Sequence, residues 1–218
     1  MDLLALGPLE LWDQGRQFDL GPLKQRRVLA ALLHARGAPV PVGTLACRVW
    51  STTAPPADPG AALHAYVSRL RPVLHEAGGD RLGIDRPSHD RYRLRFDPED
   101  VDLLRFRRLR REATAAAERG DRQLAVGKLH TAESEWSGEP LTEFTCDWAR
   151  ALRARLRGER RRVQEQRLCL EMEMGRHAAV LGELNELAAR HSLDSLVPFD
   201  QRSIGLLILA MYRAGKAR

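Results

Sequence analysis

The 218-residue sequence contains little lysine, little cysteine and few aromatic residues. Lysine occurs only at Lys24, Lys128 and Lys216, so arginine supplies almost all of the positive charge. Because an arginine- and alanine-rich composition is also typical of a GC-rich genome, the arginine excess alone says little about function. The three cysteines are odd in number and far apart, which argues against a disulfide framework or a zinc site and favours buried thiols in a reducing cytoplasm.

Long apolar runs and catalytic motifs are also missing. No window reaches the roughly 18 uninterrupted apolar residues that a membrane helix needs, so we expect no membrane partner. The N-terminus is apolar but begins with an acid and has no basic region, which argues against a secretory signal. The chain has no P-loop, dinucleotide fingerprint, GxSxG or HExxH motif, and no acid pair beside a histidine. We therefore expect a protein that is not an enzyme and needs no cofactor or metal.

The net charge is +6, and it is spread unevenly. Residues 1–96 contain 13 Lys and Arg against 9 Asp and Glu, a net charge of +4, whereas residues 97–218 contain 22 against 20, a net charge of +2. A basic chain suits a polyanionic partner, but basicity also keeps many proteins soluble. Charge alone therefore permits nucleic-acid binding without establishing it.

The first half of the chain begins with strand patterns and then becomes helical. Apolar and polar residues alternate over 3–12 and again over 16–20, on either side of the turn Asp13-Gln14-Gly15. From Lys24 the apolar residues recur with helical spacing and predict a helix that Gly37 ends. A second, shorter helix is predicted within 40–50.

A third helix and a hairpin follow a loop. The stretch 51–60 is rich in proline and small polar residues, which predicts a loop. The helix predicted at 61–77 has apolar residues at i, i+4, i+7 and i+11, which we expect to face the core: Leu63, Val67, Leu70 and Leu74. Alternation returns at 82–96 and predicts a hairpin whose second strand points Arg91, Arg93 and Arg95 away from the core.

From about residue 97 onward every strand signal disappears. Helical patterns follow at 102–119, 121–136, 147–174, 176–191 and 200–214. Two stretches with similar spacing begin at Gly120 and Gly175, which favours stacked helical hairpins of tetratricopeptide type, although the spacing of the hinges is irregular. The predicted fold class is mixed and mainly α, with a winged helix-turn-helix (α+β) at 1–96 and an all-α helical repeat domain at 97–218.

The order of strands, three helices and a hairpin is that of a winged-helix DNA-binding domain. In such a domain the third helix is held on one side, and its free side donates to base edges or phosphates in the major groove. The hairpin suits the minor groove or its phosphates, and the free N–H groups at the start of the first helix attract phosphate. The predicted DNA-contacting residues are Lys24, Arg26, Arg27, His64, Ser68, Arg69, Arg71, Arg91 and Arg93.

Each of these assignments has a simpler alternative. We expect Arg69 to contact a base or the groove and Arg71 a phosphate, but an ordinary solvated helix face would look similar. For Arg91 and Arg93, minor-groove contact and plain solubility are equally open. The stretch 150–167 carries eight arginines against two glutamates, and there we favour a solvated helix over a second surface for nucleic acid or polymerase.

In its order of motifs the chain resembles the Streptomyces antibiotic regulatory protein family of bacterial activators. The resemblance extends over nearly the whole chain and is carried by KQRRVLAALLHARG, LACRVW, ALHAYVSRLRPVL, RYRLRFDPEDVDLLRFRRL, SEWSGEPL and MGRHAAVLGELNELAARHSL. It implies an OmpR/PhoB-like winged helix joined to a bacterial transcriptional activator domain with tetratricopeptide-like repeats. It also implies binding to direct repeats in double-stranded promoter DNA as a dimer or as tandem protomers. The resemblance further implies that the protein recruits the RNA polymerase holoenzyme through its sigma factor region. The regulated genes would then be antibiotic or other secondary-metabolite gene clusters.

Three features depart from the family pattern. The apolar stretch IGLLILAMY is followed only by RAGKAR, where the second helix of a repeat is expected. This indicates a truncated chain, a naturally shortened domain, or a face covered by a second protomer. The link at 192–203 is longer than usual, which leaves the packing of the last repeat open. Pro41 replaces a polar helix cap, and the hairpin turn SHDRY replaces one that contains glycine.

Two functions are therefore open on the sequence. The one we favour is a sequence-specific DNA-binding transcription activator without catalysis. The alternative is a tetratricopeptide-type adaptor whose winged helix contacts protein and no longer binds DNA.

Overall fold

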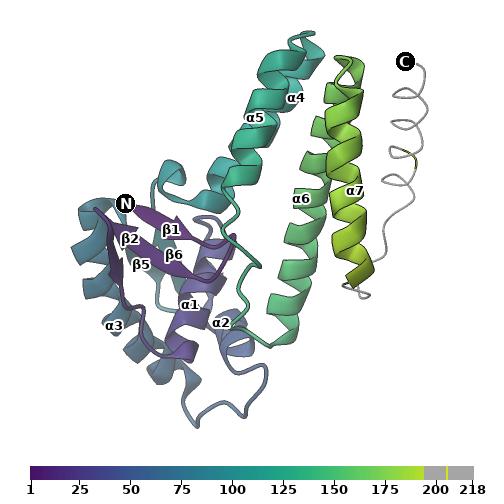
Figure 1. Ribbon diagram of the computed structural model, residues 1–218. Coiled ribbons are helices and arrows are strands. Elements are labelled where there is room, and N and C mark those ends of the chain that lie inside the picture. The colour runs from purple at the N-terminus through teal and green to yellow at the C-terminus, as the bar shows by residue number, and fades with distance from the viewer. Residues whose placement is uncertain (194–204, 206–218) are drawn as a thin grey trace. The chain divides into compact units, whose positions relative to one another are not determined.

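The computed structural model describes residues 1–193 and residue 205. Within that part the chain is mainly helical, with two small sheets confined to the first half (Figure 1). The elements are β1 (Asp2–Leu4), β2 (Glu10–Asp13), β3 (Arg16–Phe18), α1 (Leu23–His34), β4 (Val40–Pro41), α2 (Val42–Val49), α3 (Pro59–Gly78), β5 (Gly83–Ser88), β6 (Arg91–Arg95), α4 (Asp102–Glu118), α5 (Arg122–Ser134), α6 (Asp147–Glu173) and α7 (His177–Leu193), with short 3-10 turns at Gly79–Arg81 and Pro98–Asp100. The helix predicted at 200–214 and the apolar face assigned to it lie outside the described residues, residue 205 apart, and so does most of the stretch 192–203.

The N-terminal sheet confirms the predicted strand alternation. Its order is β1-β2-β3 and both pairs are antiparallel, with Leu11 opposite both Leu3 and Phe18. The two-residue turn between β2 and β3 consists of Gln14 and Gly15, both with positive φ (48° and 79°). Such a turn matches the right-handed twist of paired strands, which explains why Asp-Gln-Gly closes this hairpin.

The three predicted helices and the predicted hairpin are all present, and the hairpin strands belong to a second sheet. The stripe on α3 is fully buried, because Leu63, Val67, Leu70 and Leu74 each expose 0% of their surface. Asp58 caps this helix by accepting from the Ala61 backbone N–H at 2.9 Å, and Pro59 occupies its first turn. The second sheet has the order β4-β6-β5, and β6 alternates between exposed arginines and buried residues as expected.

The described chain divides into two compact units. The first consists of residues 1–106 and 135–157, and the second of residues 107–134 together with the chain from residue 158 onward. The change in sequence pattern near residue 97 thus lies inside the first unit. As a division between domains, the boundary after residue 96 stays a prediction.

Asp102 shows why residues beyond 97 belong with the first unit. Its side chain is fully buried, and its carboxylate accepts from the backbone N–H groups of Ala5 at 2.8 Å, Leu6 at 2.8 Å and Leu103 at 2.6 Å. Burial raises the pKa of this carboxyl to about 6, although the backbone donors act in the opposite direction. The downstream acid thereby satisfies buried backbone groups that immediately follow β1.

In the second unit, two short turns join helices into hairpins. Gly120 lies between α4 and α5, and Gly175 lies between α6 and α7, with φ values of 82° and 81° that favour glycine at a helix end. An ion pair of 2.7 Å between Glu112 and Lys128 links α4 to α5. The α6–α7 hairpin packs through an apolar cluster of Leu168, Met172, Val180 and Leu184. These are the two glycine-led stretches that the sequence singled out.

We predict that Asp102→Asn lowers the free energy of unfolding by about 2 kcal/mol at pH 7.5, because the new amide N–H₂ would face backbone N–H donors. Since the folded-state pKa lies above the ordinary value of about 3.9, the titration of Asp102 favours folding most at low pH, and this contribution is lost as the pH rises through about 6. The cost of the substitution should therefore be larger at pH 5 than at pH 7.5.

Urea unfolding of both proteins at the two pH values measures this, with the exposed Glu118→Gln as a control. An unchanged midpoint for Asp102→Asn at both pH values would contradict this role of Asp102.

Candidate nucleic-acid interface

The outer face of α3 carries three of the predicted contact residues. His64, Ser68 and Arg69 are all exposed, on the side opposite the buried leucine and valine stripe. Arg69 forms no hydrogen bond or ion pair with any residue in the described part of the chain. Its guanidinium can therefore donate to a base edge or a phosphate without first breaking a bond within the protein.

Arg71, on the same helix, is bonded within the protein. It is half-buried, and its Nε donates to the backbone carbonyl of Ile84 at 3.0 Å, which joins α3 to β5. Arg71 is therefore less accessible than the fully exposed position that the helical spacing predicts. Its contact with phosphate stays a prediction.

A second link joins α3 to the hairpin. The Tyr92 side chain is 1% exposed, and its hydroxyl lies 3.4 Å from His64 Nδ1. The guanidinium carbon of Arg86 lies 5.5 Å from the centre of the Tyr92 ring, and Arg86 Nε donates to the His89 carbonyl at 3.2 Å. Alternation along the strand indicated that Tyr92 is buried, but nothing in the sequence indicated that its hydroxyl meets the outer face of α3.

The arginines on β6 are exposed but lie beside acids. Arg93 pairs with Asp85 at 3.0 Å, and Arg91 Nε lies 3.8 Å from the carboxylate of Asp90. A hydrogen bond from the Ser88 hydroxyl lowers the pKa of Asp90, which keeps this carboxylate charged. The hairpin therefore presents less positive charge than its arginine content predicts, and phosphate would have to compete with these carboxylates.

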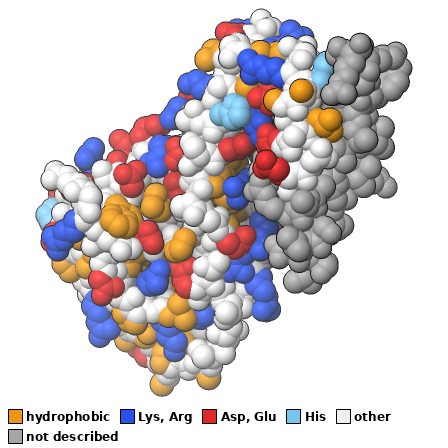
Figure 2. Space-filling model, viewed as in Figure 1, with side chains coloured by type: hydrophobic (Ala, Val, Ile, Leu, Met, Phe, Trp, Pro, Cys, Tyr) orange, Lys and Arg blue, Asp and Glu red, His pale blue; other side chains and the backbone are white. Residues whose placement is uncertain are grey.

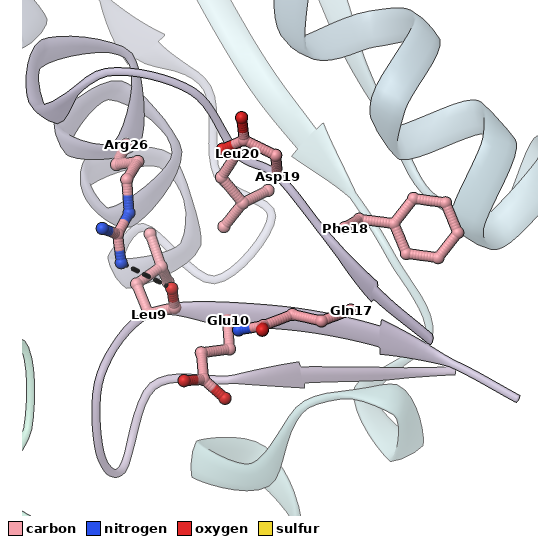
Figure 3. A pocket seen from close by; sticks show the side chains of 7 residues that line it. All are labelled: Leu9, Glu10, Gln17, Phe18, Asp19, Leu20 and Arg26. Carbon is pink, nitrogen blue, oxygen red and sulfur yellow. Dashed lines mark hydrogen bonds between the residues drawn. The ribbon is translucent and has the colours of Figure 1, made fainter. Parts of the chain in front are cut away.

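The start of α1 does not present all of its basic residues outward. Arg26 donates to the Leu9 carbonyl at 2.9 Å and pairs with Glu143 at 2.7 Å. Figure 3 shows its side chain turned toward Leu9 at the edge of a cavity of about 400 Å³. The Lys24 side chain is half-buried, and its ammonium lies 6.0 Å from the centre of the Trp50 ring.

Arg27 is a correction to the predicted set. It is 3% exposed, and its Nη1 donates to the Val49 carbonyl at 3.1 Å and to the Thr52 hydroxyl at 3.3 Å. A guanidinium enclosed in this way holds the end of α2 against α1. We therefore leave Arg26 and Arg27 out of the proposed interface, because both are bound inside the protein.

The arginine-rich stretch 150–167 also contains inward-facing members. Arg153 donates to the carbonyls of Leu141 at 2.7 Å and Phe144 at 2.9 Å. In the second unit, Arg167 is 2% exposed and bonds to Glu133, Glu171 and Glu183. Burial alone would lower the pKa of Arg167, but hydrogen bonds to Glu183 and Glu133 outweigh it and raise the pKa. These arginines serve packing, so the surface basicity of the stretch is smaller than its composition indicates.

The visible surface has no extended patch of one charge. On the face shown in Figure 2, arginine and lysine side chains are interspersed with aspartate and glutamate over the described residues. No group of three or more histidine, cysteine or acidic side chains suited to a metal ion occurs among the described residues. Within the same part of the chain, no helix is long and apolar enough to cross a membrane.

Comparison with protein families matches residues 101–218 to the bacterial transcriptional activator domain, which is more than half of the chain. The regulatory protein DnrI of Streptomyces peucetius is 30% identical over 222 residues, and the match covers 99% of this chain and 79% of DnrI. The chain belongs to the Streptomyces antibiotic regulatory protein family. The resemblance stated from the sequence motifs is thereby confirmed.

Other members of the family extend well beyond the matched region. The regulatory protein AfsR of Streptomyces coelicolor is 34% identical over 213 residues, and the match covers 97% of this chain but 20% of AfsR. A solved structure of Mycobacterium tuberculosis EmbR in complex with a low-affinity phosphopeptide superposes with a TM-score of 0.87 at 30% identity. That match covers 99% of this chain and 55% of the EmbR chain, so this chain corresponds to a part of these relatives. All three are named as regulatory proteins, and EmbR as a transcriptional one.

The different environments of Arg27 and Arg69 predict unequal effects on stability. Arg27→Met should lower the free energy of unfolding by about 2 kcal/mol, because it leaves the Val49 carbonyl without its donor. Arg69→Met should change it by less than about 0.5 kcal/mol, because the side chain is exposed and unbonded. Chemical denaturation of the two variants beside the parent protein makes the comparison, and equal costs would contradict these two environments.

Proposed function

We propose that this chain is a sequence-specific DNA-binding transcriptional activator, with α3 in the major groove and the β5–β6 hairpin beside the neighbouring minor groove. The observation that carries the proposal is the outer face of α3. One side of the helix is fully buried, while Arg69 on the other side is exposed and unbonded. Membership in a family of transcriptional regulators supports the same function.

The assignment of contacts follows from which groups are accessible. Arg69 and Ser68 are positioned to donate to base edges, and His64 lies beside them, with one ring nitrogen near the Tyr92 hydroxyl. Lys24 and Arg71 are assigned to phosphate. Arg91 and Arg93 are assigned to the minor-groove side, where the neighbouring acids weaken their contribution. The expected DNA affinity therefore depends more on α3 than on the hairpin.

The wider role of the chain is also part of this proposal. We assign residues 1–96 to the winged-helix domain and residues 97–218 to the activator domain, and we interpret the two glycine-linked helical hairpins as tetratricopeptide-like repeats. The chain would bind direct repeats in promoter DNA as a dimer or as tandem protomers, and recruit RNA polymerase holoenzyme through its sigma factor region. The genes it controls would belong to a secondary-metabolite cluster, as the family name indicates.

A salt titration tests whether the chain binds DNA through phosphates. Binding to a duplex from the promoters beside its own gene should weaken as salt increases, with log affinity falling by about 0.9 per phosphate contact for each unit of log salt. Fluorescence anisotropy with a labelled duplex gives this slope. Binding that is absent at low salt, with the folded protein confirmed by circular dichroism, would favour the adaptor function over the activator function.

The role of Arg69 is tested by comparing two DNA sequences. Arg69→Ala should cost about 1–3 kcal/mol of binding free energy on the promoter duplex if Arg69 reads a base, and clearly less on random duplex of equal length. Arg150→Ala removes the same charge from an exposed arginine of α6, where Arg150 pairs with Asp147, and should leave both affinities nearly unchanged. Equal losses on both duplexes would make Arg69 a phosphate contact.

A further inference from the structure

A cleft in the first compact unit is lined by basic groups and an indole. It has a volume of about 310 Å³ and lies between the end of α1, the last turn of α2 and the first turns of α6. Its lining residues are His34, Arg48, Trp148, Ala151, Leu152 and Arg155, none of which is acidic. We call it the α1–α2–α6 cleft. It does not include any of the residues assigned above to DNA.

Arg48 holds a central place among these groups. Its guanidinium carbon lies 5.9 Å from the centre of the Trp148 ring, and the Trp148 Nε1–H donates to the Arg48 carbonyl at 2.9 Å. Its Nη1 makes a long hydrogen bond of 3.3 Å to the Ala31 carbonyl. The side chain of Arg48 is thus fixed against the indole, while its charge is met by a peptide carbonyl.

Two other half-buried arginines of this unit are met by carboxylates. Arg26 pairs with Glu143 at 2.7 Å, and Arg105 pairs with Glu135 at 2.9 Å. Burial alone would lower the pKa of Arg105, but Glu135 raises it, whereas burial lowers the pKa of Arg48. A buried cation normally needs a counter-charge. Arg48 has no such carboxylate among the cleft-lining residues: its guanidinium donates to the Ala31 carbonyl and otherwise borders the cleft.

The other two basic residues lie against each other in the same lining. Arg155 Nη2 is 3.2 Å from Nε2 and 3.4 Å from Nδ1 of His34, so the guanidinium lies against the imidazole ring. This contact orients both groups along the wall of the cleft. Two guanidinium groups and an imidazole form a donor set that suits the several oxygens of a phosphate group.

We infer that the α1–α2–α6 cleft binds a small phosphate monoester, with its phosphate between Arg48 and Arg155 and its organic part against Trp148 and Leu152. The volume exceeds that of phosphate alone, and the indole offers a flat apolar surface beside the charges. The cleft is lined by α6 and by α1 and α2, which both pack against α3. A ligand bound there would therefore be an effector of the winged-helix domain. The inference does not depend on the proposed DNA binding.

Titration of the full chain with adenosine 5′-monophosphate, inorganic phosphate and adenosine tests this site without DNA. Isothermal calorimetry should show binding of the monophosphate with a Kd between about 1 µM and 1 mM, weaker binding of phosphate, and none of adenosine. Arg155→Gln should raise the Kd about tenfold, as should Arg48→Gln if that variant folds. Arg150→Gln, which removes an equal charge from the same helix outside the cleft, should leave the Kd unchanged.

Three results would overturn the inference. Binding of neither phosphate compound, or equal weakening by Arg155→Gln and Arg150→Gln, would mean that no specific site exists. Binding of adenosine as tight as that of the monophosphate would exclude phosphate recognition. Displacement of the monophosphate by a short duplex, with DNA affinity itself lowered by Arg155→Gln, would make the cleft a part of the DNA interface instead.

Discussion

Much of the arrangement of this protein follows from the cost of enclosing a guanidinium group. A buried cation must be paired or hydrogen-bonded, because it loses its hydration on leaving water. Arg107 meets this requirement through two hydrogen bonds of 2.8 Å to Glu159, and Arg167 through three glutamates. Arg27 meets it with a carbonyl and a hydroxyl. Arginines bound in this way hold helices together and are not available to a polyanion.

The same constraint separates composition from function. A net charge of +6 and an arginine-rich sequence are compatible with extensive DNA contact. Many of the arginines are bound within the protein. The exposed and unpaired positive charge on the proposed DNA-binding surface, the outer face of α3 and the hairpin, is therefore concentrated at few positions, above all Arg69. Recognition of DNA by such a surface rests on the geometry of α3 more than on a broad positive field.

The sequence predicts the elements well because burial of one face imposes a period. The sequence predicts both the buried stripe of α3 and the alternation of β6. Leu63 belongs to a series of buried residues with helical spacing, and Tyr92 belongs to a series with the two-residue spacing of a strand. Periodicity does not predict which residues the basic side chains will contact. Glu143 lies 117 positions from Arg26, and no local pattern indicates that the two side chains meet. On α3, His64, Ser68 and Arg69 are exposed, whereas Arg71 is bonded to β5. On α1, Arg26 and Arg27 are both bonded within the protein.

The relation of α3 to the hairpin has a functional consequence. Arg71 bonds α3 to the backbone of β5, and Tyr92 of β6 reaches His64 on the outer face of α3. These contacts fix the separation between the two elements that would enter neighbouring grooves. A reading surface that is held in place before binding loses less conformational entropy when the complex forms.

Asp102 connects the two sides of the change in sequence pattern near residue 97. The end of the strand pattern near residue 97 marks a change of secondary structure. The acceptor for the backbone N–H groups of Ala5 and Leu6 nevertheless lies beyond that point, in the carboxylate of Asp102. A segment that ended at residue 96 would leave these donors without the carboxylate. The segment after β1 and the start of α4 are therefore coupled through a buried hydrogen-bonding requirement, which periodicity in the sequence does not reveal.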